Sequence, residues 1–108
     1  MQIVLDVMAR ASLRESLREL IIDDLQKWDY ELEVVSEKKI GRRSGWAKIK
    51  ARDLSGVLNV SWHANSKTLI VRAVGKRGHS PGDLVGRFIA YLLERRRKDI
   101  SGVIIRTV

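Results

Sequence analysis

The sequence predicts an α+β fold, a two-layer sandwich in which a mainly antiparallel sheet of five to six strands carries two helices on one face. Three observations lead to this prediction. Two stretches have apolar residues at three- and four-residue steps, the spacing of amphipathic helices. Several others alternate polar and apolar residues, the period of half-buried strands. The length of 108 residues suits a single domain, 1–108, with the element order (β)αββββαβ.

The first helix is expected over residues 12–29. Ser12 and Glu15 have the spacing of a capping box. The apolar stripe behind them consists of Leu13, Leu17, Leu20, Ile21, Leu25 and Trp28. Residues 2–8 alternate as in a strand but also suit a backward extension of this helix. A short strand is preferred.

Four stretches with period-two alternation predict strands in the middle of the chain. They are Tyr30 to Val34, Trp46 to Arg52, Val57 to His63 and Lys67 to Val74. The turn signals between them are Gly41 to Gly45, Asp53 to Gly56 and Ala64 to Ser66. The last turn predicts a hairpin with opposed apolar residues: Leu58, Val60 and Trp62 against Leu69, Val71 and Ala73.

The second helix is expected to begin at Ser80-Pro81-Gly82-Asp83. Serine suits the cap, proline the first helical position and aspartate the reciprocal cap. The apolar residues that follow at helical spacing are Leu84, Val85, Phe88, Ile89, Leu92 and Leu93. A last strand is expected over Val103 to Val108.

Composition excludes several classes of site. The chain has no cysteine, which rules out a disulfide framework, a thiol nucleophile and sulfur-ligated zinc. His63 and His79 are its two histidines, too few for a histidine-rich metal site. No apolar run approaches the roughly 18 to 20 residues that span a bilayer, and the N-terminus lacks the pattern of a secretory signal. We therefore expect a cytoplasmic protein without a metal, a cofactor or a membrane partner.

Charge is distributed unevenly along the chain. Residues 1–37 contain four basic and nine acidic side chains, whereas residues 38–108 contain 17 basic and four acidic ones. The overall net charge of +8 thus hides a segment of net charge +13. Such asymmetry indicates a polyanionic partner for one surface, and nucleic acid is the partner to consider first. A generally basic proteome or an acidic subunit neighbour would explain it equally well.

The first candidate site is one face of the strand from Trp46 to Arg52. Because side chains alternate across a strand, the small apolar residues Ala47, Ile49 and Ala51 face the helices. The opposite face then presents Trp46, Lys48, Lys50 and Arg52. Cations around an aromatic ring suit single-stranded nucleic acid, whose phosphates need charge and whose bases stack. The alternative is a solvated face whose lysines discourage edge-to-edge pairing.

The second candidate is the loop Gly75-Lys76-Arg77-Gly78-His79, directly before the second helix. Glycines allow the backbone to approach an anion, and a helix N-terminus attracts phosphate. The Gly-x-x-Gly spacing resembles the loop that clamps nucleotides in KH modules, although there the loop joins two helices. Lys76, Arg77 and His79 would contact the ligand. The alternative is a turn that uses glycine for positive φ.

The third candidate combines Arg42 and Arg43 in the Gly41 turn with the cations Arg95 to Lys98 at the end of the second helix. A basic helix end suits the helix dipole and is more often solvated than a binding site. These residues would matter as part of a larger basic patch.

An enzyme is a weaker interpretation. The helix and strand order resembles metal-dependent nucleases that use Asp…Glu-x-Lys, and Glu37-Lys38-Lys39 supplies the last part. No aspartate sits suitably on the preceding strand, and Asp53 lies in a turn signal. The sequence therefore favours a small, non-catalytic protein that binds RNA or DNA. A homo-oligomeric assembly or adaptor protein is the alternative, and a nuclease comes third.

Overall fold

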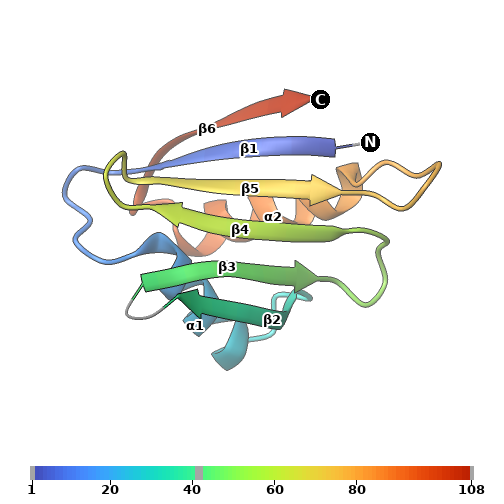
Figure 1. Ribbon diagram of the computed structural model, residues 1–108, viewed down its shortest axis with the longest axis horizontal. Helices are drawn as coiled ribbons and strands as arrows, with labels where there is room; N and C mark the ends of the chain where they lie inside the picture. Colours follow the sequence, from blue (N-terminus) through green and yellow to red (C-terminus); the bar gives the residue numbers. More distant parts are fainter. Residues whose placement is uncertain (1, 41–42, 108) are drawn as a thin grey trace.

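Residues 2–40 and 43–107, which the computed structural model describes without the side chains of 38–40 and 43–44, form one six-stranded antiparallel sheet and two helices (Figure 1). The strands are β1 (Gln2–Ala9), β2 (Glu33–Ile40), β3 (Arg43–Lys50), β4 (Val57–His63), β5 (Thr68–Val74) and β6 (Ile100–Thr107). The helices are α1 (Leu17–Lys27) and α2 (Gly82–Arg95). The predicted α+β class and element order are confirmed.

The strand order in the sheet is β2-β3-β4-β5-β1-β6. The preferred strand at the N-terminus is confirmed, and it lies between β5 and β6, antiparallel to both. Leu5 of β1, for example, is opposite Val71 of β5 and Ile105 of β6. The β4–β5 hairpin has the predicted register, with Val60 opposite Val71.

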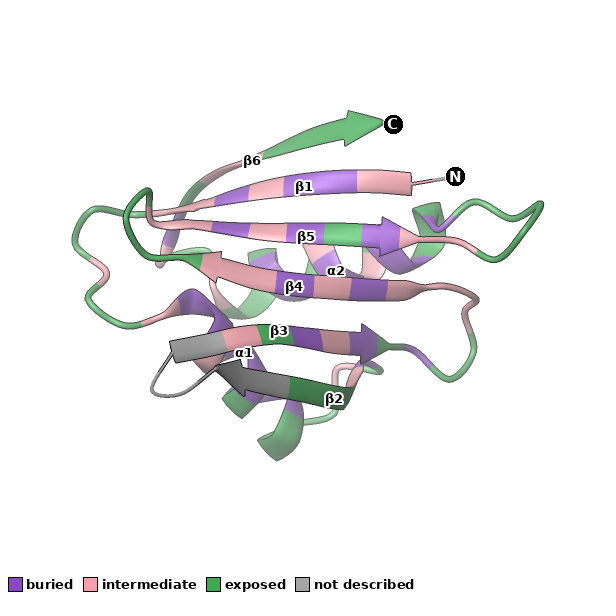
Figure 2. Cartoon of the chain, viewed as in Figure 1, coloured by how far each residue is buried: buried purple, intermediate pink, exposed green. Residues whose placement is uncertain are grey.

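Both helices lie on the same side of the sheet, behind the strands in Figure 1. The core fills the space between the two layers. Its helical part comes from Leu17, Ile21 and Leu25 of α1 and from Leu84, Phe88 and Leu92 of α2. Its strand part includes Leu5, Val7, Ile49, Leu58, Val60, Leu69 and Val71. Figure 2 shows buried residues alternating with more exposed ones along β4 and β5, because successive side chains point to opposite faces. Neither helix of the described residues covers the other face of the sheet (Figure 1).

Helix α1 begins at Leu17, five residues later than predicted. The cap is Ser16, whose Oγ accepts a hydrogen bond from the Glu19 N–H at 3.4 Å. Ser16 and Glu19 have the same spacing as Ser12 and Glu15, so the sequence contains two capping signals and the second is used. The prediction that Ser12 caps this helix was wrong.

Helix α2 begins at Gly82, one residue after the predicted start. Pro81 occupies the cap position, where no side chain makes a capping hydrogen bond. Ser80 Oγ accepts a hydrogen bond from the Gly82 N–H at 3.1 Å, so it still satisfies one main-chain donor at this end. Among the described residues, no helix is long and apolar enough to cross a membrane.

A buried carboxylate joins the two helices. Asp24 of α1 is 2% exposed. It accepts two hydrogen bonds of 2.7 Å from Arg96, which follows α2, and a third from the hydroxyl group of Tyr91 in α2. Arg96 also donates to Asp99 at 3.0 Å. We call Asp24, Tyr91 and Arg96 the interhelical clamp; it holds α1 beside α2 on one face of the sheet.

The clamp determines the ionisation of its members. Burial alone raises the pKa of Asp24, but the hydrogen bonds from Arg96 and Tyr91 outweigh it, so the pKa is lowered. Burial and the hydrogen bond to Asp24 raise the pKa of Tyr91. Asp24 is therefore a carboxylate and Tyr91 a neutral phenol at neutral pH.

Replacing Asp24 tests the clamp. Asp24→Asn removes the negative charge and leaves Arg96 partly buried without its main partner, so the free energy of unfolding in urea should fall by about 3–5 kcal/mol. The control is Asp23→Asn, since Asp23 pairs with Lys27 at 3.0 Å on the exposed side of the same helix. Asp23→Asn should lower the free energy of unfolding by less than about 1 kcal/mol. Equal costs for the two variants would contradict the clamp.

The lowered pKa of Asp24 also predicts a pH dependence. A carboxylate whose pKa is lowered by folding stabilises the protein at pH values above its unfolded-state pKa, here 3.8. This stabilisation is lost as the pH falls through the folded-state pKa. The unfolding free energy of the wild type should therefore drop more steeply below pH 3.8 than that of Asp24→Asn. Urea titrations at several acidic pH values measure this, and parallel curves would refute it.

Candidate nucleic-acid interface

The sheet face without helices carries the predicted side chains of β3. Ala47 and Ile49 are fully buried against the helices, so Trp46, Lys48 and Lys50 point to the opposite face as expected. Trp46 is 41% exposed, and Lys48 Nζ lies 5.9 Å from the centroid of its ring. We call this surface the open face.

The register aligns cations from three strands in one row across the open face. Lys48 is opposite Asn59, Asn59 opposite Arg72, Arg72 opposite Val4, and Val4 opposite Arg106. Neighbouring strands are about 4.8 Å apart. The cations of β3, β5 and β6 therefore start from backbone positions spaced by about 10 Å. We call Lys48, Arg72 and Arg106 the basic row.

A second row runs beside the basic row and is largely apolar. It consists of Trp46, Ser61, Ile70, Asp6 and Ile104, again opposite one another in that order. Two residues along a strand separate the rows by about 6–7 Å. On β3, β5 and β6 an apolar side chain thus precedes a cation by two positions, as in Trp46 and Lys48. We call Trp46, Ile70 and Ile104 the apolar row.

Two residues of the basic row have partners on the open face. Arg72 donates to Gln2 Oε1 at 3.1 Å, and Arg106 donates to Asp6 Oδ1 at 2.9 Å. The Arg106 side chain remains half exposed in this ion pair. Exposed ion pairs contribute little stability, so a phosphate can compete with Asp6 for Arg106.

A shallow hollow of about 550 Å³ lies at the end of the apolar row. Ile70, Ile104 and Met8 supply apolar surface to this hollow. Its polar lining comes from His63, Ser66, Thr68 and the ion-paired residues Asp6 and Arg106. Ser61 Oγ lies 3.3 Å from His63 Nε2. The hollow gives the open face a recess where a planar group can contact apolar side chains.

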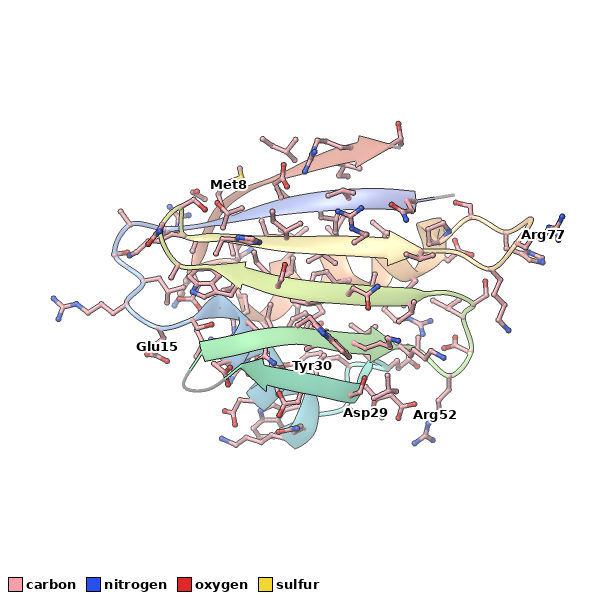
Figure 3. All side chains as sticks on the ribbon, in the orientation of Figure 1. Met8, Glu15, Asp29, Tyr30, Arg52 and Arg77 are labelled. Carbon is pink, nitrogen blue, oxygen red and sulfur yellow. The ribbon has the colours of Figure 1, made fainter. Side chains whose placement is uncertain are left out.

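Arg52, predicted to continue this face after Lys50, lies beyond the end of the strand. Strand β3 ends at Lys50, and Arg52 lies in the connection to β4 with its side chain 89% exposed. It points away from the sheet in Figure 3, and its Nε lies 3.8 Å from Glu33 Oε2. Asp29, Glu31 and Asp53 line the same depression, so this end of the molecule is acidic.

The glycine-bounded loop after β5 is a turn. The His79 N–H donates to the Lys76 carbonyl at 2.8 Å, and Gly78 has a φ of 80°. A Cβ at Gly75 would lie 2.2 Å from the His79 carbonyl oxygen, so glycine is needed there for the close return of the chain. Lys76, Arg77 and His79 are exposed, and Arg77 projects beyond the end of the sheet in Figure 3. The turn interpretation therefore accounts for both glycines.

The third predicted cluster is described only in part. Arg42 lies outside the described residues, as does the side chain of Arg43, whose main chain begins β3. Arg95 and Arg96 lie at the end of α2, on the helix side, and both bond to Asp24. The buried partners of Arg96 make it a structural residue.

The carboxylates considered for a nuclease lie apart. Glu37 in β2 is opposite Ala47 and forms an ion pair of 3.3 Å with Arg18. Asp53 follows β3 and forms an ion pair with Arg87. Hydrogen bonds from Arg87 lower the pKa of Asp53. Within the described part of the chain, no group of three or more acidic or histidine side chains is arranged to hold a metal ion.

Arg72 and Arg106 were missed by the sequence analysis. The alternation in β5, where Leu69, Val71 and Ala73 face the helices, was a sufficient signal to place Arg72 on the other face. The position of Arg106 depends on the pairing of β6 with β1, which connects opposite ends of the chain. Local patterns do not contain that information.

The fold and this surface define a two-layer α+β protein with an exposed, basic sheet face. Comparison with models of protein families, with curated proteins and with solved structures finds no match.

The loop geometry predicts different effects for two glycine substitutions. Gly75→Ala forces a Cβ against the His79 main chain and should destabilise the fold by about 1–3 kcal/mol. Gly86→Ala is the control, because nothing lies within 4 Å of a Cβ there and alanine favours helix α2. It should stabilise by about 0.5–1 kcal/mol. Thermal or urea unfolding measures both, and a neutral Gly75→Ala would show that the loop is not closely packed.

Proposed function

We propose that the open face binds single-stranded nucleic acid without catalysing a reaction on it. The observation that carries the proposal is the pairing of the two rows: the apolar row lies beside the basic row over the width of five strands. A single strand has the same division, with bases on one side and phosphates on the other. Apolar and aromatic side chains contact the bases, and the cations contact the phosphates.

A single strand fits this surface better than a duplex does. In a duplex the flat faces of the bases are covered by stacking, so an exposed ring such as Trp46 has no base to stack on. In a single strand the faces are accessible, and contact with an aromatic ring contributes about 1–3 kcal/mol per base. Trp46 at one end of the apolar row and the hollow beside Ile104 at the other would each take a base.

The charge distribution supports the same partner. The sheet from β3 onward belongs to the segment of net charge +13, and each cation that contacts a phosphate releases a counterion from the nucleic acid. Lys76 and Arg77 lie beyond the end of β5 and would attract the strand without reading its sequence. The proposed contacts distinguish neither DNA from RNA nor one base from another, because they involve phosphates and ring faces.

The expected cytoplasmic location and the homo-oligomeric alternative remain predictions. A nuclease has no comparable support, since Glu37 and Asp53 are each engaged by an arginine at different places in the fold. Self-association has one favourable observation, the exposed strand β6 at the edge of the sheet.

Two variants separate the proposed roles of the rows. Lys48→Ala/Arg72→Ala removes two phosphate contacts and should reduce the slope of log affinity against log salt by about 1.4, or ~0.7 per contact. Trp46→Ala should weaken binding by about 1–3 kcal/mol and leave that slope unchanged. Fluorescence anisotropy with a labelled single-stranded oligonucleotide at several salt concentrations measures both quantities.

The matched control is Arg14→Ala/Arg97→Ala, which removes the same charge from exposed positions outside the sheet. If the control reduces the slope as much as the open-face variant, binding reflects net charge and the proposed site is wrong. A wild-type protein that binds no oligonucleotide at ~50 mM salt would overturn the function itself.

A further inference from the structure

Strand β6 leaves a long, apolar edge of the sheet exposed. It is the last strand on its side in the described part of the chain, paired with β1 alone. Ile104 is 52% exposed on the open face, and Ile105 is 56% exposed on the helix face. Figure 2 shows most of the strand as exposed, in contrast to β1 beside it.

The opposite edge of the sheet differs from β6. Strand β2 has two shifts of register along its pairing with β3, and it carries Glu33 and Glu37. Irregularity and charge are the usual means of preventing an edge strand from pairing with another molecule. Strand β6 has one shift, near its start, and then continues through Val103, Ile104 and Ile105 to a single cation. This edge is not protected against pairing.

The hydrogen-bond pattern shows which main-chain groups face the open edge. On the β6 side of β1, the Arg10 N–H donates to the Asp99 carbonyl, and the Met8 carbonyl accepts from the side-chain hydroxyl group of Ser101. On the β5 side, the Ala9 N–H donates to Lys67. Even-numbered residues of β1 therefore pair with β6, and Asp6 exchanges its hydrogen bonds with Ile104.

In β6 the alternation then leaves the odd-numbered residues unpaired. Val103, Ile105 and Thr107 direct their N–H and carbonyl groups away from β1, toward the open edge. These groups form a regular series of donors and acceptors that a further antiparallel strand would satisfy.

We propose that a second copy of this chain supplies that strand, with the two β6 strands antiparallel about a two-fold axis at Ile104. In this register Ile104 lies opposite the partner's Ile104 on the open face. Val103 lies opposite the partner's Ile105 on the helix face, where the two residues exchange main-chain hydrogen bonds. A two-fold contact of this kind is self-complementary, as closed dimers require.

The sizes and charges of the facing side chains favour the register at Ile104 over the register at Ile105. Arg106 lies opposite the partner's Gly102, which has no side chain, and the Arg106–Asp6 ion pair of each copy flanks the central isoleucines. Moving the axis by one residue to Ile105 would place each Arg106 opposite an isoleucine. The register at Ile104 therefore keeps apolar residues opposite apolar residues and the two arginines apart.

Helix α2 carries a further exposed apolar side chain. Arg87 and Tyr91 bond to Asp53 and Asp24, on the α1 side of this helix. Residues two positions further lie on the opposite side, because two residues turn an α-helix by about 200°. Leu93, 52% exposed, thus lies on the side of α2 that faces away from α1.

Disulfide trapping tests the register directly, because the chain has no cysteine and a disulfide between two protein thiols of a single-cysteine variant must join two copies. Ile104→Cys places the thiols at a non-hydrogen-bonded pair with Cα atoms about 4.5 Å apart, within the range of a disulfide. Mild oxidation with oxidised glutathione should give a covalent dimer. Ile105→Cys is the matched control. The Cα atoms of residue 105 in the two copies would be about 7–8 Å apart, so this variant should form little covalent dimer.

A second variant tests the pairing without cysteine. Ile105→Pro removes an N–H that points outward, so the sheet within one copy keeps its hydrogen bonds while the proposed dimer loses two. The wild type should have twice the chain mass of 12.3 kDa by light scattering, and Ile105→Pro should have the monomer mass with an unchanged circular dichroism spectrum. A monomeric wild type up to about 1 mM overturns the proposal. So does equal trapping of the two cysteine variants.

Discussion

The interhelical clamp is the interaction on which the rest of the structure depends. A buried carboxylate is stable only when charged and hydrogen-bonding groups replace its water, and for Asp24 they come from Tyr91 and Arg96. These partners belong to α2 and its end, so α1 is held beside α2. Both helices then cover the same face of the sheet, and the other face is left for solvent or a ligand.

An uncovered sheet face is organised by register, because side chains opposite one another on neighbouring strands form rows. Here the rows differ in chemistry. Lys48, Arg72 and Arg106 share one row, while Trp46 and the two isoleucines share the next. The turn after β5 and the arginines after α2 are explained by local structure instead, since Gly75 permits a close return and Arg96 neutralises Asp24.

Local patterns in the sequence were sufficient for the fold class and for part of the site. Ala47 and Ile49 alternate with Trp46 and Lys48, and this alone orients β3. Two features could not be predicted from local sequence patterns. Ser12 and Ser16 offer equivalent caps, and only packing selects Ser16. The insertion of β1 between β5 and β6 depends on contacts between distant segments, so the full basic row was not predictable.

The proposed function places a single strand of nucleic acid along the two rows of the open face. The most direct test is a titration of ¹⁵N-labelled protein with a single-stranded oligonucleotide, followed by amide NMR shifts. The largest shifts should occur where the rows cross three strands, at 46–48, 70–72 and 104–106. Shifts confined to the loop 75–79, or to α1 and α2, would contradict it.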